Sequence, residues 1–431
     1  MLLRQPRVTV LVVSFLCAFS TSPLLADKVV HWAKPLAQDY TIVHRVRELA
    51  DPDQWVCVGS PDILRLPNGR LIASMELWLQ TPNEGREGGI DYPNHCKIKI
   101  SDDSGKTWQL HSTNSVTWGS LFIANDALYM IGNNPKTRTI ILVRSPDMGK
   151  TWSDEVTLFE DAHYSGGATS VHIKNGYVYR AFEDNDLRSA SLVVVGDLSK
   201  DLLDPASWQM SPKVEPPRHT PAFSRSAATD LVGRDAHGNW FLEGNIVDIR
   251  GQLSVLLRTR IDKQLTANVT SICELDHNGK QLQYRFVQYY PMPGGQNKFK
   301  LLYDPTSQLY WTCTTVPPDT YQDPEPLKQR GLKTGPGNMR RILMLNYSLD
   351  CLNWFQAGCV AMSKNPLEAF NYSSQVVDGK DLLVLARSSL GGQLPYNNHD
   401  TNAITLHRIK NFRSLAIDLR QDFEHHSDDV P

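Results

Sequence analysis

Short apolar runs alternate with polar residues along most of the chain, and turn residues separate them. Runs of about four to eight residues bounded by Gly, Asn or Asp predict β-strands and hairpins. Asn68-Gly69, Asn175-Gly176 and Asp378-Gly379 are such turns. Long stretches with the period of an amphipathic helix are nearly absent, so the pattern predicts an all-β protein. The predicted strands include Ile63–Leu66, Leu71–Met75, Lys97–Ser101, Thr139–Ser145, Val171–Ile173, Gly176–Ala181, Leu192–Val195, Leu253–Thr259, Ile342–Tyr347 and Leu382–Ala386.

A turn motif of the form S-x-D-x-G-x-T-W occurs twice, at Ser101–Trp108 and at Ser145–Trp152. A degenerate copy runs from Ser348 to Trp354, and a looser turn with a tryptophan lies at Asp204–Trp208. The Asp carboxylate is expected to accept backbone N–H groups across a tight hairpin, and the Gly supplies a conformation that other residues resist. The Trp ring is expected to pack between neighbouring sheets. The motif therefore predicts a structural turn.

The spacing of the two full copies predicts a propeller. The copies start at residues 101 and 145, a difference of 44, which fits one four-stranded blade. A mature chain of about 400 residues then has room for six or seven such blades. We predict a six-bladed β-propeller in one domain, residues 27–431, with loops such as Pro212–Pro221 and Val316–Pro336 as insertions on one face.

The N-terminal segment differs from the rest of the chain. Arg4 and Arg7 precede the apolar run Val8–Phe19, and the small-residue stretch Ser20–Ala26 follows it. This order is typical of a secretory signal peptide, so we expect residues 1–26 to be removed and the protein to be secreted or periplasmic. The run is short for a membrane span, and no second segment is long and apolar enough to be one.

Composition narrows the range of partners. The formal net charge is −2 over 431 residues, which argues against nucleic acid or an anionic membrane as the main partner. Six cysteines remain after removal of Cys17, and none shows the CxxC spacing of a zinc site. Cys351 and Cys359 are close enough in sequence to join two neighbouring strands. No spacing of carboxylates or histidines predicts a metal site, and we expect no cofactor.

The repeated turns on a propeller of about six blades resemble the Asp boxes (BNR repeats) of the sialidase, or neuraminidase, superfamily. The resemblance covers most of the mature chain as a blade pattern. It implies an exo-glycosidase in which a tyrosine attacks the sugar, a glutamate takes the tyrosine proton, an acid protonates the leaving group and three arginines bind the substrate carboxylate. A glycan or oligosaccharide is then the expected partner.

The resemblance assigns the nucleophile and its base to two strand segments. Tyr372 lies in Asn371-Tyr372-Ser373-Ser374, which leads through Asp378-Gly379 into an apolar strand, like the stretch that carries the sialidase tyrosine. Glu243 stands 15 residues before Arg258 in numbering (258 − 243), as the base and the second arginine do in the family. The alternative interpretations are a tyrosine in the channel wall and a structural ion pair.

The remaining arginines are matched less completely. Counting back from the late turn at Ser348 reaches Arg340, and we favour it over its neighbour Arg341 as the third arginine. The position of the first arginine falls on Gly59, and Asp62 brings a negative charge to the same region. Substrate-binding candidates at this place are therefore Asp62 and Lys298, with Arg218 and Arg225 as further cationic options.

The general acid has several candidates. The family places it in a loop that corresponds here to Trp78–His95, which contains Glu84 and Asp91, and Glu76 at the end of the preceding strand is a further option. A general acid needs a raised pKa, which requires burial. Loop segments such as Gly294–Lys298 and Tyr396–Asp400 carry groups suited to sugar hydroxyls, so His399 is a further binding candidate.

Three functions remain open from the sequence. The first is a secreted, retaining exo-glycosidase of the sialidase type or for a related sugar. The second is a non-catalytic propeller that binds glycans or a protein, since a fold by itself does not establish activity. The third is a glycosidase for a non-sialic sugar that uses only carboxylates, drawn from Asp62, Glu76 and Asp91.

Overall fold

The computed structural model describes residues 34–46, 54–80, 95–217, 240–260, 268–318, 325–329 and 339–418. All of them belong to one compact unit, Lys34–Pro431. The predicted signal peptide, the acid candidates Glu84 and Asp91, and the alternative cations Arg218 and Arg225 lie outside the described residues.

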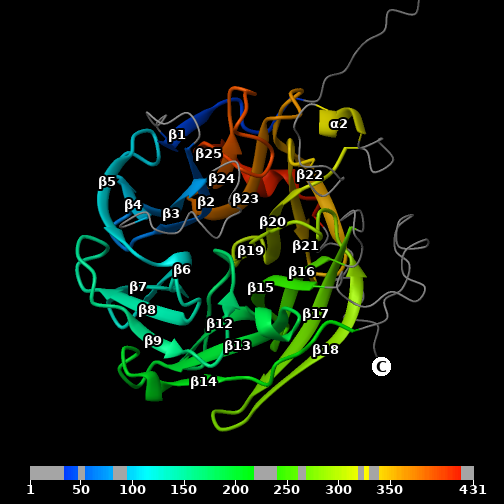
Figure 1. The fold of residues 1–431 in the computed structure, drawn as a ribbon. Coiled ribbons are helices and arrows are strands. Elements are labelled where there is room, and N and C mark those ends of the chain that lie inside the picture. Colours follow the sequence, from blue (N-terminus) through cyan, green and yellow to red (C-terminus); the bar gives the residue numbers. More distant parts are fainter. Residues whose placement is uncertain are drawn as a thin grey trace, which may run out of the picture. The chain divides into compact units, whose positions relative to one another are not determined.

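This unit is a six-bladed β-propeller, as the sequence predicts, and the blades follow one another around a common centre (Figure 1). Blade I contains β2 (Trp55–Arg65), β3 (Leu71–Gln80), β4 (Cys96–Ser101) and β5 (Gln109–Asn114). Blade II contains β6 (Thr117–Ala124), β7 (Ala127–Asn133), β8 (Ile140–Ser145) and β9 (Val156–Phe159). Blade III contains β10 (Tyr164–Ser165), β11 (His172–Lys174), β12 (Tyr177–Asp184), β13 (Ala190–Asp197) and β14 (Trp208–Met210).

The second half of the chain forms the other three blades. Blade IV contains β15 (Trp240–Ile249), β16 (Gln252–Arg260), β17 (Val269–His277) and β18 (Leu282–Pro291). Blade V contains β19 (Leu301–Asp304), β20 (Leu309–Thr315), β21 (Ile342–Ser348) and β22 (Trp354–Met362). Blade VI contains β23 (Ala369–Asp378), β24 (Asp381–Ser389), β25 (Ala403–Ile409) and β1 (Tyr40–Arg45). The described helices are the short α2 (Glu325–Gln329), η2 (Asn185–Leu187), η3 (Pro205–Ser207) and η5 (Phe412–Leu415).

Strands from the two ends of the propeller domain complete the last blade together. β1 pairs antiparallel with β25, and Tyr40 lies opposite His407. The first strands of the blades lie innermost, because β2 contacts both β6 and β23, and β19 contacts both β15 and β23. The ring is therefore closed by backbone pairing inside blade VI.

The cores lie between neighbouring blades, as expected from sheets that are apolar on both faces. One cluster combines Ile72 and Ile98 of blade I with Leu128 and Ile141 of blade II. Trp152 packs against this cluster, and its indole N–H donates to Ser112 Oγ of blade I at 3.0 Å. Trp108 packs in the same way against a cluster shared by blades VI and I, so both rings lie between sheets as predicted.

The three turns with the repeated motif are stabilised by hydrogen bonds to their own aspartate. Asp103 accepts from the backbone N–H of Thr107 at 2.9 Å and from its hydroxyl at 2.6 Å, and Asp147 does the same with Thr151 at 2.8 and 2.7 Å. At the degenerate copy, Asp350 accepts from the N–H groups of Leu352 and Asn353. All three turns thus satisfy their aspartate within the turn.

Four inner strands share one irregularity that matters for function. β2, β6, β15 and β23 each contain a β-bulge, and one residue in each bulge has a positive φ: Ser60 (38°), Trp118 (52°), Glu243 (49°) and Tyr372 (50°). Non-glycine residues rarely adopt this left-handed conformation, and such strain concentrates at functional sites. Bulges also re-aim the side chains that they carry.

Polar side chains just after these bulges join the inner strands to one another. Asp62 Oδ2 accepts from the N–H of Leu121 at 2.9 Å, and Ser374 Oγ donates to Asp62 Oδ1 at 2.6 Å. Asn245 Nδ2 donates to the carbonyl of Phe299 at 3.1 Å, and Ser120 Oγ donates to that of Thr169 at 3.0 Å. These bonds close the centre of the propeller beneath the bulged residues.

Two further observations concern the described part of the chain. No helix within it is long and apolar enough to cross a membrane. It contains no disulfide: Cys351 is buried in the turn before β22, Cys359 lies on β22, and the two are not bridged.

Candidate functional site

A cavity of about 380 Å³ opens at the inner-strand bulges, within the size range of small-molecule sites. All four positive-φ residues line it. The described residues that line the cavity are Ser60, Glu76, Leu77, Trp78, His95, Thr117, Trp118, Pro135, Arg138, Ser165, Gly166, Glu183, Asn185, Trp240, Leu242, Glu243, Arg258, Tyr372, Arg387 and His399. Every blade except blade V contributes to this wall.

One guanidinium group connects the predicted nucleophile and the predicted base. Arg258 Nη1 donates to the Tyr372 hydroxyl at 2.9 Å and to Glu243 Oε2 at 3.0 Å. Its Nε donates to the carbonyl of Gln296 at 3.0 Å, which fixes the guanidinium plane. Burial acts to lower the pKa of Arg258, but Tyr372 and Glu243 raise it overall. The role of Glu243 as the base for Tyr372 predicts a direct hydrogen bond between them, but these two described side chains form none and instead share Arg258 Nη1.

Three arginines surround the Tyr372 ring. The Cζ atoms of Arg387, Arg340 and Arg258 lie 4.8, 5.6 and 6.0 Å from its centroid. All three are buried. Burial lowers the pKa of Arg340 to about 10, and the neighbouring charges of Arg258 and Arg387 add to this. Positive charge is thus concentrated on one side of the cavity.

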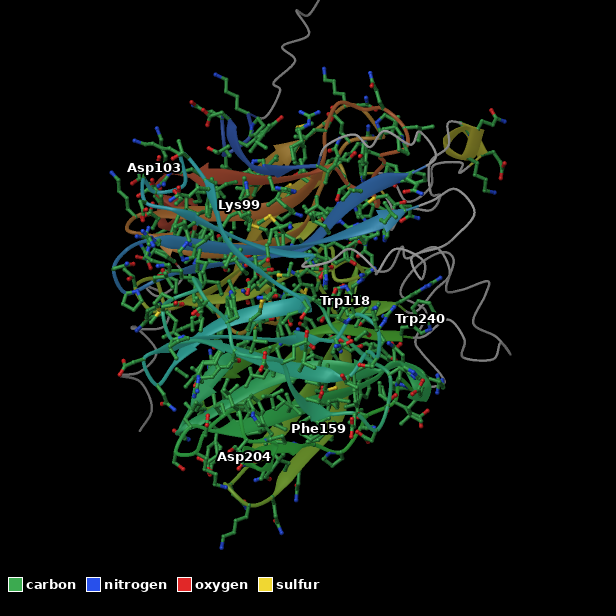
Figure 2. The ribbon with its side chains drawn as sticks, turned by 60° about the vertical axis from the view of Figure 1, so that its left-hand side comes forward. Lys99, Asp103, Trp118, Phe159, Asp204 and Trp240 are labelled. Carbon is green, nitrogen blue, oxygen red and sulfur yellow. The ribbon has the colours of Figure 1, made fainter. Side chains whose placement is uncertain are left out.

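Aromatic rings form much of the remaining wall. Arg387 lies over Trp78 with its Cζ 5.1 Å from the ring centroid, and Arg260 lies over Trp240 at 4.5 Å. In Figure 2 Trp118 and Trp240 lie further to the right, away from Asp103 and Asp204 at the left. Rings that offer an apolar face beside polar groups are suited to the faces and hydroxyls of sugars.

Glu76 is a buried residue of the cavity wall whose carboxyl group accepts two hydrogen bonds from blade II. Its Oε2 accepts from the N–H of Trp118 at 2.5 Å and from the Thr117 hydroxyl at 3.0 Å. Burial raises the pKa of Glu76, and these hydrogen bonds oppose the rise. Glu76 thereby connects blade I to blade II.

Glu183 is a second buried glutamate in the cavity, and sequence reasoning did not select it. It lies on β12, opposite Ser165 of β10. Burial raises the pKa of Glu183 to about 8, and the charge of Glu243 adds to the rise.

The position where an arginine is expected at Gly59 is filled by another side chain. A Cβ at Gly59 would lie 2.6 Å from Cζ3 of Trp78 and 3.4 Å from Oε1 of Glu76. Any larger residue at this position would clash with the indole ring. Arg387 of β24, rather than a residue of β2, brings the additional guanidinium to the site.

The other sequence candidates divide between the wall and the interior. His399 lines the cavity, and its Nδ1 lies 2.7 Å from Asp400 Oδ1. Asp62, Lys298 and Arg340 are buried but are not among the lining residues. Lys298 donates to the carbonyls of Ser373 at 2.7 Å and Tyr372 at 3.4 Å, and burial lowers its pKa to about 7. Asp62 receives hydrogen bonds from Lys300 and Ser374.

The residues that sequence reasoning missed share a weak local signal. Arg387 and Glu183 lie in mostly buried strands, and a charged residue among apolar neighbours is the only hint of them in the sequence. Charged residues are seldom fully buried without a role, so such positions could have been flagged. Within the described ranges, no group of three or more His, Cys, Asp or Glu side chains is arranged to hold a metal ion.

No protein-family model matches the chain, and no curated protein matches its sequence. Several solved structures are similar in fold. A sialidase from Trypanosoma rangeli in complex with sialic acid aligns with a TM-score of 0.54 and 15% identity, over 86% of this chain and 57% of that one. A protein of unknown function from Dyadobacter fermentans gives 0.53 and 12%, over 87% and 98% of the two chains. An α-L-arabinofuranosidase from Fusarium graminearum gives 0.50 and 12%, over 86% and 98%.

These identities establish likeness of fold. The chain spans little more than half the length of the sialidase that it resembles. The sialidase and the arabinofuranosidase are glycosidases named for different sugars. The fold of this chain is therefore similar to that of glycoside-hydrolase propellers.

Proposed function

We propose that the protein is a glycoside hydrolase that releases a terminal sugar from a glycan. The observation that carries the proposal is the cluster in which Arg258 holds both the phenol of Tyr372 and the carboxylate of Glu243 at the wall of an aromatic-lined cavity. A phenol is a weak nucleophile by itself and needs an adjacent base. Here a carboxylate is held beside it by one shared guanidinium group.

The proposed reaction is a double displacement. The Tyr372 oxygen attacks the anomeric carbon, its proton passes to Glu243, and the bond to the leaving oxygen breaks as a carboxylic acid protonates that oxygen. Water then attacks the glycosyl-tyrosine by the reverse steps, so the sugar leaves with retained configuration. Transfer of the phenol proton requires Glu243 to approach Tyr372 when substrate binds, and catalytic hydrogen bonds often tighten in this way.

The form of the cavity favours the end of a glycan. The hydrogen bonds of Asp62, Asn245 and Ser120 join neighbouring inner strands beneath the bulged residues, which favours a substrate that enters the cavity by one end. The guanidinium groups of Arg258 and Arg387 line the cavity and favour an anionic sugar, because a carboxylate is bound best by planar, bidentate donors. An acidic sugar with a terminal position is therefore the substrate class that we propose.

The test is a panel of aryl glycosides of acidic and neutral sugars, assayed with the purified protein. The wild type should hydrolyse at least one acidic glycoside, and Tyr372→Phe and Glu243→Gln should each lose at least about 100-fold in kcat/KM. Tyr303→Phe is the matched control, because Tyr303 is an exposed tyrosine of β19 and its loss should leave activity unchanged. Saturable glycan binding without hydrolysis by the wild type would instead establish a binding module.

A second candidate is a glycosidase that uses only carboxylates. Three glutamates, Glu76, Glu183 and Glu243, line the same cavity, so an acid and a nucleophile are both available without the tyrosine. The same variants separate the two candidates. Activity retained in Tyr372→Phe but lost in Glu243→Gln would favour the carboxylate reaction and exclude Tyr372 as the nucleophile.

We also propose that the protein is exported and that residues 1–26 are its signal peptide, on the charge and hydropathy pattern of that segment. N-terminal sequencing of protein recovered from outside the cytoplasm should give a start near Asp27. A start at Met1 would contradict the proposal.

A further inference from the structure

Glu183 is completely buried, and none of the ion pairs in the described ranges includes its carboxyl group. Its Oε2 receives one long hydrogen bond, from Ser165 Oγ at 3.4 Å, and its Oε1 has no partner among the described residues. The guanidinium group of Arg180, whose charge acts on Glu183, donates to Ser120 and to the carbonyls of Ala181 and Gly167 instead. The backbone N–H groups of Glu243 and Gly244 act on Glu183 as weak donors, but it lacks the arginine that pairs with Glu243.

A buried carboxyl in this environment is held as the neutral acid. Removing an ionised carboxylate from water without a paired cation or several donors is costly, and the group takes up a proton instead. Glu243 avoids this cost through Arg258, and Glu76 avoids part of it through Trp118 and Thr117. The pKa of Glu183, raised to about 8 by burial and by the charge of Glu243, agrees with this assignment.

Glu183 and Glu243 line the same cavity. β10 ends at Ser165, and the next residues are Gly166 and Gly167. A Cβ at Gly167 would lie 3.0 Å from Cγ of Glu243, so a side chain at this position would press on the Glu243 carboxyl group. The absence of a side chain at Gly167 therefore leaves room beside the Glu243 carboxyl group on the wall that Glu183 also lines.

We propose that Glu183 is the proton donor of this site, which rests on the proposed glycoside hydrolysis. The proton of the Glu183 carboxylic acid passes to the glycosidic oxygen while the bond between that oxygen and the anomeric carbon breaks. The electron pair of the broken bond remains on the leaving oxygen, which departs as a hydroxyl. In the second step the Glu183 carboxylate takes a proton from the attacking water and is restored.

The two glutamates are coupled in a direction that helps this transfer. The negative charge of Glu243 is one cause of the high proton affinity of Glu183. When Glu243 accepts the phenol proton of Tyr372, that charge disappears and Glu183 holds its own proton less firmly. Uptake of one proton at Glu243 therefore favours release of another at Glu183 in the same step.

The first experiment varies the leaving group. Glu183→Gln is assayed with two aryl glycosides of the accepted sugar, one with a strongly acidic phenol such as 2,4-dinitrophenol and one with a weakly acidic phenol. Because only the poor leaving group needs a proton, kcat/KM should fall by about 100-fold or more for it and by less than about 10-fold for the good one. The alkaline limb of the pH profile should also be lost.

Two variants control for damage to the fold. Glu183→Asp keeps a carboxylic acid with a shorter reach and should retain part of the alkaline limb. Glu76→Gln alters a buried glutamate of the same wall, and any loss that it causes should be equal for the two leaving groups. Equal loss for the two leaving groups in Glu183→Gln, with the wild type active, would overturn the assignment of Glu183.

The second experiment does not depend on activity. An infrared spectrum of the wild type near pH 7 should contain the C=O band of a protonated carboxylic acid, which disappears in Glu183→Gln and on titration to above pH 8. Absence of that band would overturn the inference even if the protein is a glycosidase. A clear band together with no hydrolysis of any glycoside would support the buried acid and count against the proposed function.

Discussion

The pKa values of carboxyl groups are lowered at the turn end of the blades and raised at the cavity end. At the turn end, Asp147 is exposed and Asp103 is half-buried, and each accepts hydrogen bonds from residues within four positions in the sequence. At the cavity end, Glu76 and Glu183 are buried, and the groups that determine their charge come from other strands or other blades. The strands connect the two ends directly, because Glu76 lies opposite Cys96 at one end of β4 and Ser101 begins the turn at the other.

This difference in pKa suggests that the turn carboxylates serve stability and the cavity carboxyl groups serve catalysis. Hydrogen bonds lower the pKa of Asp103 and Asp147 and keep both carboxylates charged at any ordinary pH. Burial raises the pKa of both Glu76 and Glu183, and the value of about 8 for Glu183 makes proton transfer by that group accessible near neutral pH. The same residue chemistry therefore stabilises hairpins at one end and provides candidates for acid–base catalysis at the other.

Loss of Arg258 should have the largest effect on the cavity end. Arg258→Met leaves the buried Glu243 carboxylate without its cation, which should lower the free energy of unfolding by about 3–5 kcal/mol. Urea denaturation of the variant and the wild type measures this. Arg285→Met is the control, because Arg285 pairs with Glu274 and Asp276 on the exposed surface of blade IV and its loss should change stability little.

A double variant tests whether the buried charge is the cause. Glu243→Gln combined with Arg258→Met removes both charges and should recover part of the lost stability. An equal or larger loss in the double variant would mean that packing, and not the unpaired carboxylate, determines the effect.

The pH dependence of stability should run in opposite directions at the two ends. The pKa of Glu183 is raised from 4.5 to about 8 in the folded protein, so its contribution to stability is fully present below about pH 4.5 and is lost as the pH rises through 8. The difference in unfolding free energy between wild type and Glu183→Gln should therefore fall by a few kcal/mol between pH 5 and pH 9, at about 1.4 kcal/mol per unit of pKa shift.

The turn carboxylate gives the contrasting curve. The pKa of Asp147 is lowered from 3.8 to about 2, so its contribution is present above about pH 3.8 and is lost as the pH falls through 2. The difference between wild type and Asp147→Asn should stay constant from pH 5 to pH 9 and shrink only in acid. If the unfolding free-energy differences of Glu183→Gln and Asp147→Asn changed with pH in the same way, the two ends of the blades would not differ in their carboxyl pKa values.

The smallest effect is expected from truncation at a turn. Asp147→Ala removes the bonds from the Thr151 N–H and hydroxyl and from the Lys150 N–H, and water replaces them because the site is exposed. We expect a loss of about 1 kcal/mol in thermal or urea unfolding. Glycoside hydrolysis should not change, and a loss of activity without a loss of stability would show that the two ends are coupled.

The same contrast explains what the sequence could predict. Ser101–Trp108 and Ser145–Trp152 complete their structure within eight residues, so the motif, its period and the six-bladed fold could be predicted from the sequence. Tyr372, Glu243 and Arg258 were chosen by resemblance, and the structure brings these three together. Their order in space was not predictable, since Arg258 lies between the other two side chains.

The rest of the cavity depends on contacts that no local pattern contains. Arg387 reaches Tyr372 from β24, while the expected arginine position at Gly59 is taken up by Trp78 of the neighbouring strand. Glu183 is a candidate because it is buried in the wall of the cavity that Glu243 also lines. Such relations between strands are set by the bulges of the inner strands, whose left-handed residues have no sequence signature.

The pairing of β1 with β25 has a consequence for how the protein is made. Blade VI lacks its outer strand until Ala403–Ile409 has been synthesised and has met Tyr40–Arg45. A contact between segments so far apart in sequence is entropically slow to form, and it comes last during synthesis from the N-terminus. During synthesis, β1 therefore has no pairing partner while the first five blades form. The propeller becomes a closed ring only after β25 has left the ribosome and paired with β1.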